Sequence, residues 1–166
     1  MDSIGVSRLG SEQTIEVLNT LLSDELMLQM KTRNFHWNVT GPHFFPLHSL
    51  FEKQYDELAD ISDEIAERCR QLGGNAIGTL KEVLAISSIG ERPGQFPTDV
   101  EMVDELAMDH ERIIEEIQRH LEAVGNENKD LGTQDLLVDV MKKHQKTAWM
   151  LRAHLEGLDE ISEEDE

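Results

Sequence analysis

Hydrophobic residues recur at helical spacing in four long segments of the chain. In the segment 11–39 the stripe consists of Ile15, Leu18, Leu22 and Leu26. These residues lie three or four positions apart, which is typical of one face of an amphipathic helix. A Gly-Pro pair follows the segment, and proline cannot continue helical hydrogen bonding. The segment 45–72 keeps the same spacing and ends at a Gly-Gly pair, so it is predicted to be a second helix.

The second half of the chain begins with a long connection. Residues 75–97 contain several glycines and prolines and are too many for a tight turn, although their middle part, 80–88, is predicted to form a short helix. The third long helix is predicted to start at Thr98, because Thr98 and Glu101 form a capping-box pattern, and to close at Gly125.

The fourth helix is predicted to run from about Thr133 to Gly157, so that residues 1–166 form one all-α domain. Two helices, a long crossover carrying a short helix, and two more helices make the ferritin-like arrangement of a four-helix bundle. The two ends, residues 1–10 and 159–166, are expected to be tails. The second of them is almost entirely acidic and is expected to be disordered.

Charge narrows the range of partners. The chain has 34 acidic and 15 basic residues and a formal net charge of −19. Such a surface repels nucleic acid and anionic membranes and attracts cations. No apolar run approaches the ~20 residues that cross a bilayer, residues 1–10 lack the pattern of a secretory signal, and the single cysteine excludes an intrachain disulfide. We therefore expect a cytoplasmic protein with no membrane partner.

Histidines and carboxylates with the character of metal ligands gather in the first half of the chain. A di-iron centre inside a ferritin-like bundle normally uses Glu-x-x-His on two helices, and no glutamate here has a histidine three residues later. The other candidates are three histidines near the first turn and four acids further along the second predicted helix: His36, His43, His48, Asp60, Asp63, Glu64 and Glu67. His48 and Asp63 are fifteen residues apart in one predicted helix, which separates their backbones by about 22 Å. If both bind one metal ion, a second subunit must complete the site.

The sequence around these candidates resembles the Dps family. Residues 34–48 read Asn-Phe-His-Trp-Asn-Val-Thr-Gly-Pro-His-Phe-Phe-Pro-Leu-His, and residues 63–68 read Asp-Glu-Ile-Ala-Glu-Arg, with Leu-Gly-Gly soon after. The family's ligand pattern of two histidines, an aspartate and a glutamate matches this sequence in spacing at His36, His48, Asp63 and Glu67. The resemblance extends over nearly the whole chain, to a Lys-Thr-Ala-Trp-Met-Leu block at 146–151.

The resemblance implies a shell of twelve identical subunits with ferroxidase centres at its two-fold interfaces. His36 and His48 of one subunit would face Asp63 and Glu67 of another, in agreement with the helix-length argument. The implied reaction is the oxidation of Fe(II) to Fe(III), with hydrogen peroxide as the usual oxidant in the family, and ferric mineral then collects in the cavity. Imidazole and carboxylate ligands suit iron in both states. Consuming Fe(II) and peroxide together limits hydroxyl radical formation and protects against oxidative damage.

Further residues receive roles from their positions. Trp37, next to a candidate ligand, is expected either to donate an electron that quenches a leftover radical or only to contribute to packing. Arg33, one turn before His36, is expected to hold a carboxylate near the metal. Asp135 and Asp139, near the start of the fourth helix, either stabilise the helix dipole or, as the resemblance implies, form an acidic ring around a three-fold pore that attracts Fe(II).

The roles of three other histidines stay open. His43 is expected either to stabilise the turn between the first two helices or to be a third metal contact. His110 and His144 fall on apolar stripes, where a hydrogen bond usually satisfies a buried imidazole and a ligand role is the alternative.

DNA binding is not expected, although the family name suggests it. Members that bind DNA commonly use a mobile lysine-rich tail, whereas residues 1–10 carry a single basic residue and residues 159–166 carry none. The alternative to a ferroxidase is an acidic shell without catalysis, which shields DNA or sequesters other divalent metals.

Overall fold

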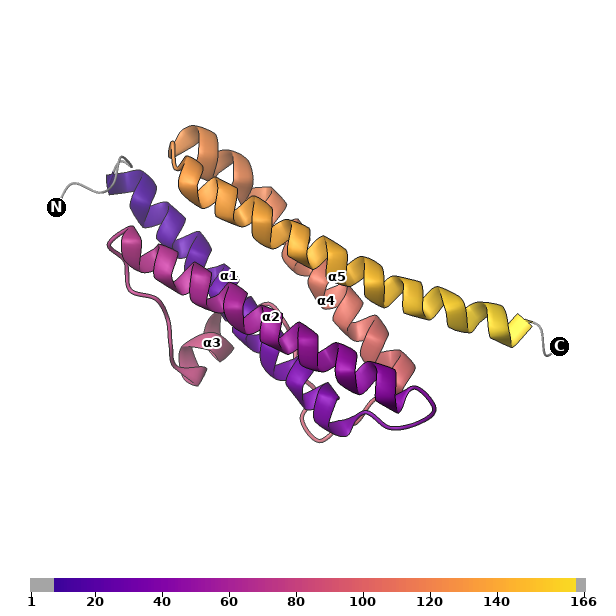
Figure 1. Ribbon diagram of the computed structural model, residues 1–166. Coiled ribbons are helices and arrows are strands. Elements are labelled where there is room, and N and C mark those ends of the chain that lie inside the picture. Colours follow the sequence, from indigo (N-terminus) through magenta and orange to yellow (C-terminus); the bar gives the residue numbers. More distant parts are fainter. Residues whose placement is uncertain (1–7, 164–166) are drawn as a thin grey trace.

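The computed structural model describes residues 8–163, with side chains described for residues 11–156. Within this part of the chain every regular element is helical. The elements are α1 (Arg8–Asn38), α2 (Phe44–Gln71), α3 (Leu80–Ile86), α4 (Asp99–Glu122), the π-helical turn η1 (Ala123–Glu127) and α5 (Leu131–Glu163). Figure 1 shows α1 beside α2 and α4 beside α5, with α3 in the crossover. The predicted all-α fold of four long helices and a short crossover helix is confirmed.

Helix ends differ from the prediction at three places. α1 begins at Arg8, so residues 8–10 are helical and do not belong to a tail. α5 continues through Gly157 to Glu163, so residues 159–163 are helical, and the rest of the predicted acidic tail lies outside the described residues. An acidic composition is compatible with a helix here, because glutamate is itself a good helix former and extending an existing helix needs no new nucleation. α4 ends at Glu122, and the predicted closing residue Gly125 lies within η1.

The core runs along the inner faces of the four long helices. Its fully buried side chains include Leu18, Leu22, Phe51, Ile65, Leu106, Ile113, Leu137 and Leu151. Each such side chain contributes about 1.5–3 kcal/mol relative to an exposed position. None of the described helices combines the length and the apolar composition that a membrane span requires. Burial of the apolar stripes visible in the sequence thus stabilises the bundle.

A buried carboxylate ties the crossover to α1. Asp24 is 1% exposed, and its Oδ1 accepts hydrogen bonds from Ser87 Oγ at 2.7 Å and from the Ser88 backbone N–H at 2.6 Å. Ser88 Oγ donates to the other carboxylate oxygen at 3.1 Å. Hydrogen bonds to a charged group are stronger than neutral ones, and three of them satisfy a charge that would otherwise be costly to bury. Asp24 therefore fixes the path of the chain directly after α3.

Replacing Asp24 with alanine should lower the free energy of unfolding by about 2 kcal/mol, because it removes charge-assisted hydrogen bonds and leaves the Ser88 N–H without an acceptor. The midpoint of thermal unfolding, measured at equal protomer concentration, is the test. Gln13→Ala, an exposed change on the same helix, is the control and should leave the midpoint nearly unchanged. Equal midpoints for the two variants would contradict the anchoring role of Asp24.

Candidate metal centre

His36 and His48 meet where α1 reverses into α2. His36 lies in the last turn of α1 and is 7% exposed, and His48 lies in the first turns of α2. Their rings stack with centroids 3.7 Å apart and planes inclined by 19°. The reversal between them needs Gly41, whose φ of +99° lies in the region that favours glycine. Two imidazoles twelve residues apart in the sequence thus form one pair.

Reciprocal hydrogen bonds fix the orientation of both rings. Nδ1 of His36 lies 2.7 Å from the backbone oxygen of His48, and Nδ1 of His48 lies 2.8 Å from the backbone oxygen of His36. A carbonyl oxygen only accepts, so each Nδ1 carries the proton and donates. When Nδ1 holds the ring's single proton, Nε2 keeps its lone pair. A metal-binding histidine characteristically donates its other ring N–H to an acceptor of this kind.

Aromatic side chains extend the imidazole pair on both sides. Phe44 stacks on His48 with ring centroids 5.0 Å apart, and Tyr55 meets His36 edge to face at 5.3 Å. The guanidinium carbon of Arg33 lies 4.4 Å from the centroid of the Tyr55 ring. Sequence reasoning missed Tyr55. The signal was its position seven residues after His48, because two helical turns bring a residue back to the same face.

Asp63 and Glu67 lie far from the imidazole pair of their own chain. Both are exposed and stand one turn apart on α2, which runs without a break from before His48 to beyond Glu67. The continuous helix confirms the assumption behind the length argument and separates His48 from Asp63 by about 22 Å. Within the described part of one chain, no three His, Cys, Asp or Glu side chains converge on a metal position. The structure brings the two histidines together and leaves the two acids apart from them.

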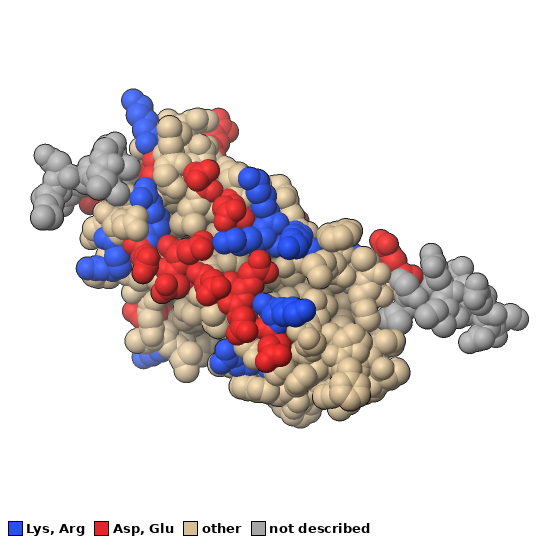
Figure 2. Space-filling model, in the orientation of Figure 1, with Lys and Arg blue, Asp and Glu red and all other residues tan. Residues whose placement is uncertain are grey.

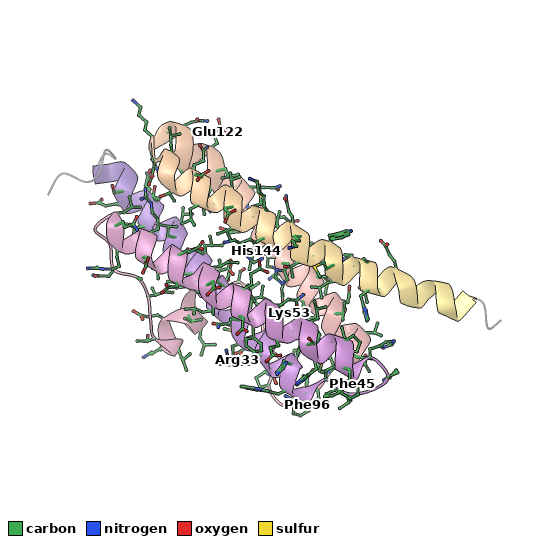
Figure 3. All side chains as sticks on the ribbon, viewed as in Figure 1. Arg33, Phe45, Lys53, Phe96, Glu122 and His144 are labelled. Atoms are coloured by element: carbon green, nitrogen blue, oxygen red, sulfur yellow. The ribbon has the colours of Figure 1, made fainter. Side chains whose placement is uncertain are left out.

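Large apolar side chains are exposed near the imidazole pair. Trp37 is 62% exposed and Phe45 is 82% exposed. Figure 2 shows charged groups gathered over the middle of the drawn face, and few of them at the end where α1 turns into α2. Figure 3 places Phe45 at that same end. An exposed apolar area of this kind is typical of a surface that another protein chain covers.

The other predicted residues take varied positions. His43 contacts an Asp99 carboxylate oxygen through Nδ1 at 2.8 Å, which links the α1–α2 turn to the start of α4. Asp139 pairs with Lys143 at 3.0 Å, and Asp135 is exposed. Asp130 is buried, caps α5 by accepting from the Thr133 N–H at 3.0 Å, and pairs with Arg68 at 2.8 Å. Asp130 thus has a structural role, and Asp135 and Asp139 keep the exposure that a pore requires.

Comparison with known proteins defines first the class and then the family. A family model described as a ferritin-like domain matches residues 15–161. DNA protection during starvation protein 2 of Bacillus anthracis is 43% identical over 145 residues, covering 87% of this chain and 98% of that protein. A low temperature-induced protein of a Nostoc species is 39% identical over 155 residues, covering 93% of this chain and 87% of that protein.

Solved structures agree with these relatives. The crystal structure of Dps from Vibrio cholerae, described as a ferritin-like diiron-carboxylate protein, superposes with a TM-score of 0.87 at 30% identity, covering 93% of this chain and 98% of that one. The chain therefore belongs to the Dps family of ferritin-like proteins. This relationship supports an iron-related role in protection against stress.

Replacing Gly41 with alanine should disturb the imidazole pair, because a residue with a side chain is strained at φ +99° by about 1–3 kcal/mol. We expect weaker anaerobic Fe(II) binding by titration calorimetry and a lower thermal midpoint. Gly73→Ala is the matched control, since Gly73 has φ +90° at the opposite end of α2 with open space around it. Gly73→Ala should lower the thermal midpoint and leave Fe(II) binding unchanged. Unchanged Fe(II) binding in Gly41→Ala would contradict the proposed dependence of the pair on this turn.

Proposed function

We propose that this protein is a ferroxidase and iron-storage shell whose catalytic centre is shared between two subunits. The observation that carries the proposal is the imidazole pair of His36 and His48, with both Nδ1 protons engaged and both Nε2 lone pairs left for a metal. Asp63 and Glu67 of a second subunit supply the carboxylates, because those of the same chain are out of reach.

The ligand set suits Fe(II) as a substrate. Imidazole nitrogen binds Fe(II), and carboxylate oxygen holds both Fe(II) and the harder Fe(III) product. Two ferrous ions each give up one electron, and hydrogen peroxide accepts both while its O–O bond breaks. The ferric ions then hydrolyse to an oxide mineral and release protons. Because peroxide is reduced by two electrons in one place, less hydroxyl radical escapes than when a single ferrous ion reacts.

Other features of the chain suit the delivery of Fe(II) to the shell and the storage of iron inside it. A net charge of −19 on each subunit of a closed twelve-subunit shell attracts Fe(II) and repels DNA, so DNA is not among the proposed partners. Asp135 and Asp139 are proposed to line a three-fold entry pore. The ion pair between Asp139 and Lys143 reduces the negative charge there, which makes Asp135 the stronger candidate of the two. Trp37 is proposed to supply an electron to a radical left beside the centre.

A shell that only sequesters divalent metals is the alternative. It shares the ligands and the charge, and it differs in showing no turnover of Fe(II) when peroxide is added. Zinc or manganese on the same ligands would give that behaviour.

The double variant His36→Ala with Asp63→Ala should slow the rapid oxidation of Fe(II) by peroxide by more than about a hundredfold, because each shared centre loses a ligand from both sides. Stopped-flow absorbance of ferric species in the near ultraviolet measures the rate, and light scattering after gel filtration checks assembly. Asp56→Ala, another exposed acid on α2, is the control and should oxidise Fe(II) at the normal rate. A normal rate in the double variant would refute the assignment, and no turnover in the unmodified shell would favour sequestration.

A further inference from the structure

Tyr55 is the single tyrosine of the chain, and its ring lies against the imidazole pair. The rings of Tyr55 and His36 meet edge to face, with centroids 5.3 Å apart and planes inclined by 80°. The tyrosine side chain is half-buried on α2, so solvent reaches only part of it. Because the two rings are in contact, an electron that passes from the phenol to a metal ion on His36 crosses one side-chain contact.

Arg33 holds the Tyr55 ring from its face. The guanidinium carbon lies 4.4 Å from the centroid of the ring, at a place where α1 runs beside α2 (Figure 3). The attraction between the cation and the ring electrons restrains the ring, and contact with His36 restrains it further. A positive charge at this position also makes the loss of an electron from the ring more difficult. Weak oxidants such as Fe(III) therefore leave Tyr55 intact, and a strong oxidant is needed.

The other aromatic residues near the imidazole pair are less suited to electron donation. Phe44 stacks on His48, but a phenyl ring has no hydroxyl group and is much harder to oxidise than a phenol. Trp37 is oxidisable, but its side chain is 62% exposed to solvent. The ring contacts of the pair thus go to Phe44 and Tyr55, and of these two only Tyr55 is readily oxidised.

The proposed reaction needs an even number of electrons at each centre. Hydrogen peroxide takes up two electrons when its O–O bond breaks, whereas each ferrous ion gives one. A centre that holds one Fe(II) is therefore one electron short, and one-electron cleavage of peroxide releases a hydroxyl radical. A nearby side chain that gives one electron and one proton removes this shortage.

We propose that Tyr55 supplies the second electron when a centre holds a single Fe(II), a role that rests on the proposed ferroxidase function. Fe(II) gives one electron, and the Tyr55 phenol gives one electron and its hydroxyl proton. The O–O bond of hydrogen peroxide breaks, and its two oxygen atoms leave as one water and one hydroxide ion. The other products are Fe(III) and a neutral tyrosyl radical, so no hydroxyl radical is released.

A second Fe(II) restores the tyrosine. This ion gives one electron to the tyrosyl radical, which takes up one proton and becomes the phenol again. The two steps together consume two Fe(II) and one hydrogen peroxide, as they do when both ferrous ions are present from the start. Tyr55 thereby preserves the two-electron reduction of peroxide when Fe(II) arrives one ion at a time.

Electron paramagnetic resonance of freeze-quenched samples of the assembled protein tests this role. Fe(II) is supplied at fewer ions than centres, with one hydrogen peroxide for each ion. We expect an organic radical whose hyperfine pattern narrows when the protein is produced with deuterated tyrosine. Because the chain has one tyrosine, that narrowing assigns the radical to Tyr55. A second, anaerobic portion of Fe(II) should remove the signal.

Tyr55→Phe should abolish the radical signal and increase the amount of spin-trapped hydroxyl radical at the same low iron loading. The phenyl ring keeps the contacts with His36 and Arg33, so the variant should retain most of the rate of Fe(II) oxidation at full loading, where Fe(II) supplies both electrons. Trp149→Phe, which changes an exposed aromatic residue on α5, is the matched control and should keep the tyrosine-derived signal.

The proposal fails if the unmodified protein gives no radical, if deuterated tyrosine does not alter the signal, or if the signal survives Tyr55→Phe. A signal that survives Tyr55→Phe and is lost in Trp37→Phe would assign the electron donor to Trp37 instead. Any of these results, obtained with rapid Fe(II) oxidation at full loading, overturns the role of Tyr55 and leaves the proposed function standing. Absence of Fe(II) oxidation at full loading contradicts the proposed function, and the role of Tyr55 with it.

Discussion

The rise of an α-helix, about 1.5 Å per residue, is the constraint on which the account depends. α2 carries His48 near its start and Asp63 and Glu67 in its second half, with no break between them. Because the helix is rigid, His48 and the two acids of one chain cannot bind the same metal ion. The same helix, paired antiparallel with a copy of itself about a two-fold axis, would place the histidine end of one chain beside the acidic part of the other. The proposed centre therefore requires assembly.

The imidazole pair at the start of α2 is oriented by contacts within one chain, without a partner subunit. The short turn after α1 lets each imidazole donate to the carbonyl of the other's residue, so no side chain from elsewhere is needed to set the tautomers. Phe44 and Tyr55 restrict the rings further, and the guanidinium group of Arg33 packs over the Tyr55 ring. A pre-oriented pair loses little conformational entropy when a metal binds. The exposed Trp37 and Phe45 beside it offer apolar area to the proposed interface.

Much of the fold could be predicted from the sequence, because apolar spacing and the Gly-Pro and Gly-Gly pairs mark four helices directly. The continuation of α5 to Glu163 could not be predicted, because composition alone does not distinguish a solvated helix from a disordered acidic tail. The spacing of His36 and His48 pointed to a ligand pair, but their mutual hydrogen bonds depend on the exact turn geometry. The apolar stripes placed His110 and His144 in the core, but their contact with each other could not be predicted, because pairing across helices leaves no periodic signal in one sequence.

Subunit mixing tests the shared centre most directly. A chain with both His36 and His48 changed to alanine and a chain with both Asp63 and Glu67 changed to alanine should each be inactive alone. When the two are unfolded together in equal amounts and reassembled, half of the interfaces are mixed, and each mixed interface holds one complete centre out of two. The account predicts recovery of about a quarter of the normal rate of Fe(II) oxidation. Co-assembled shells that stay as inactive as the separate variants would contradict it.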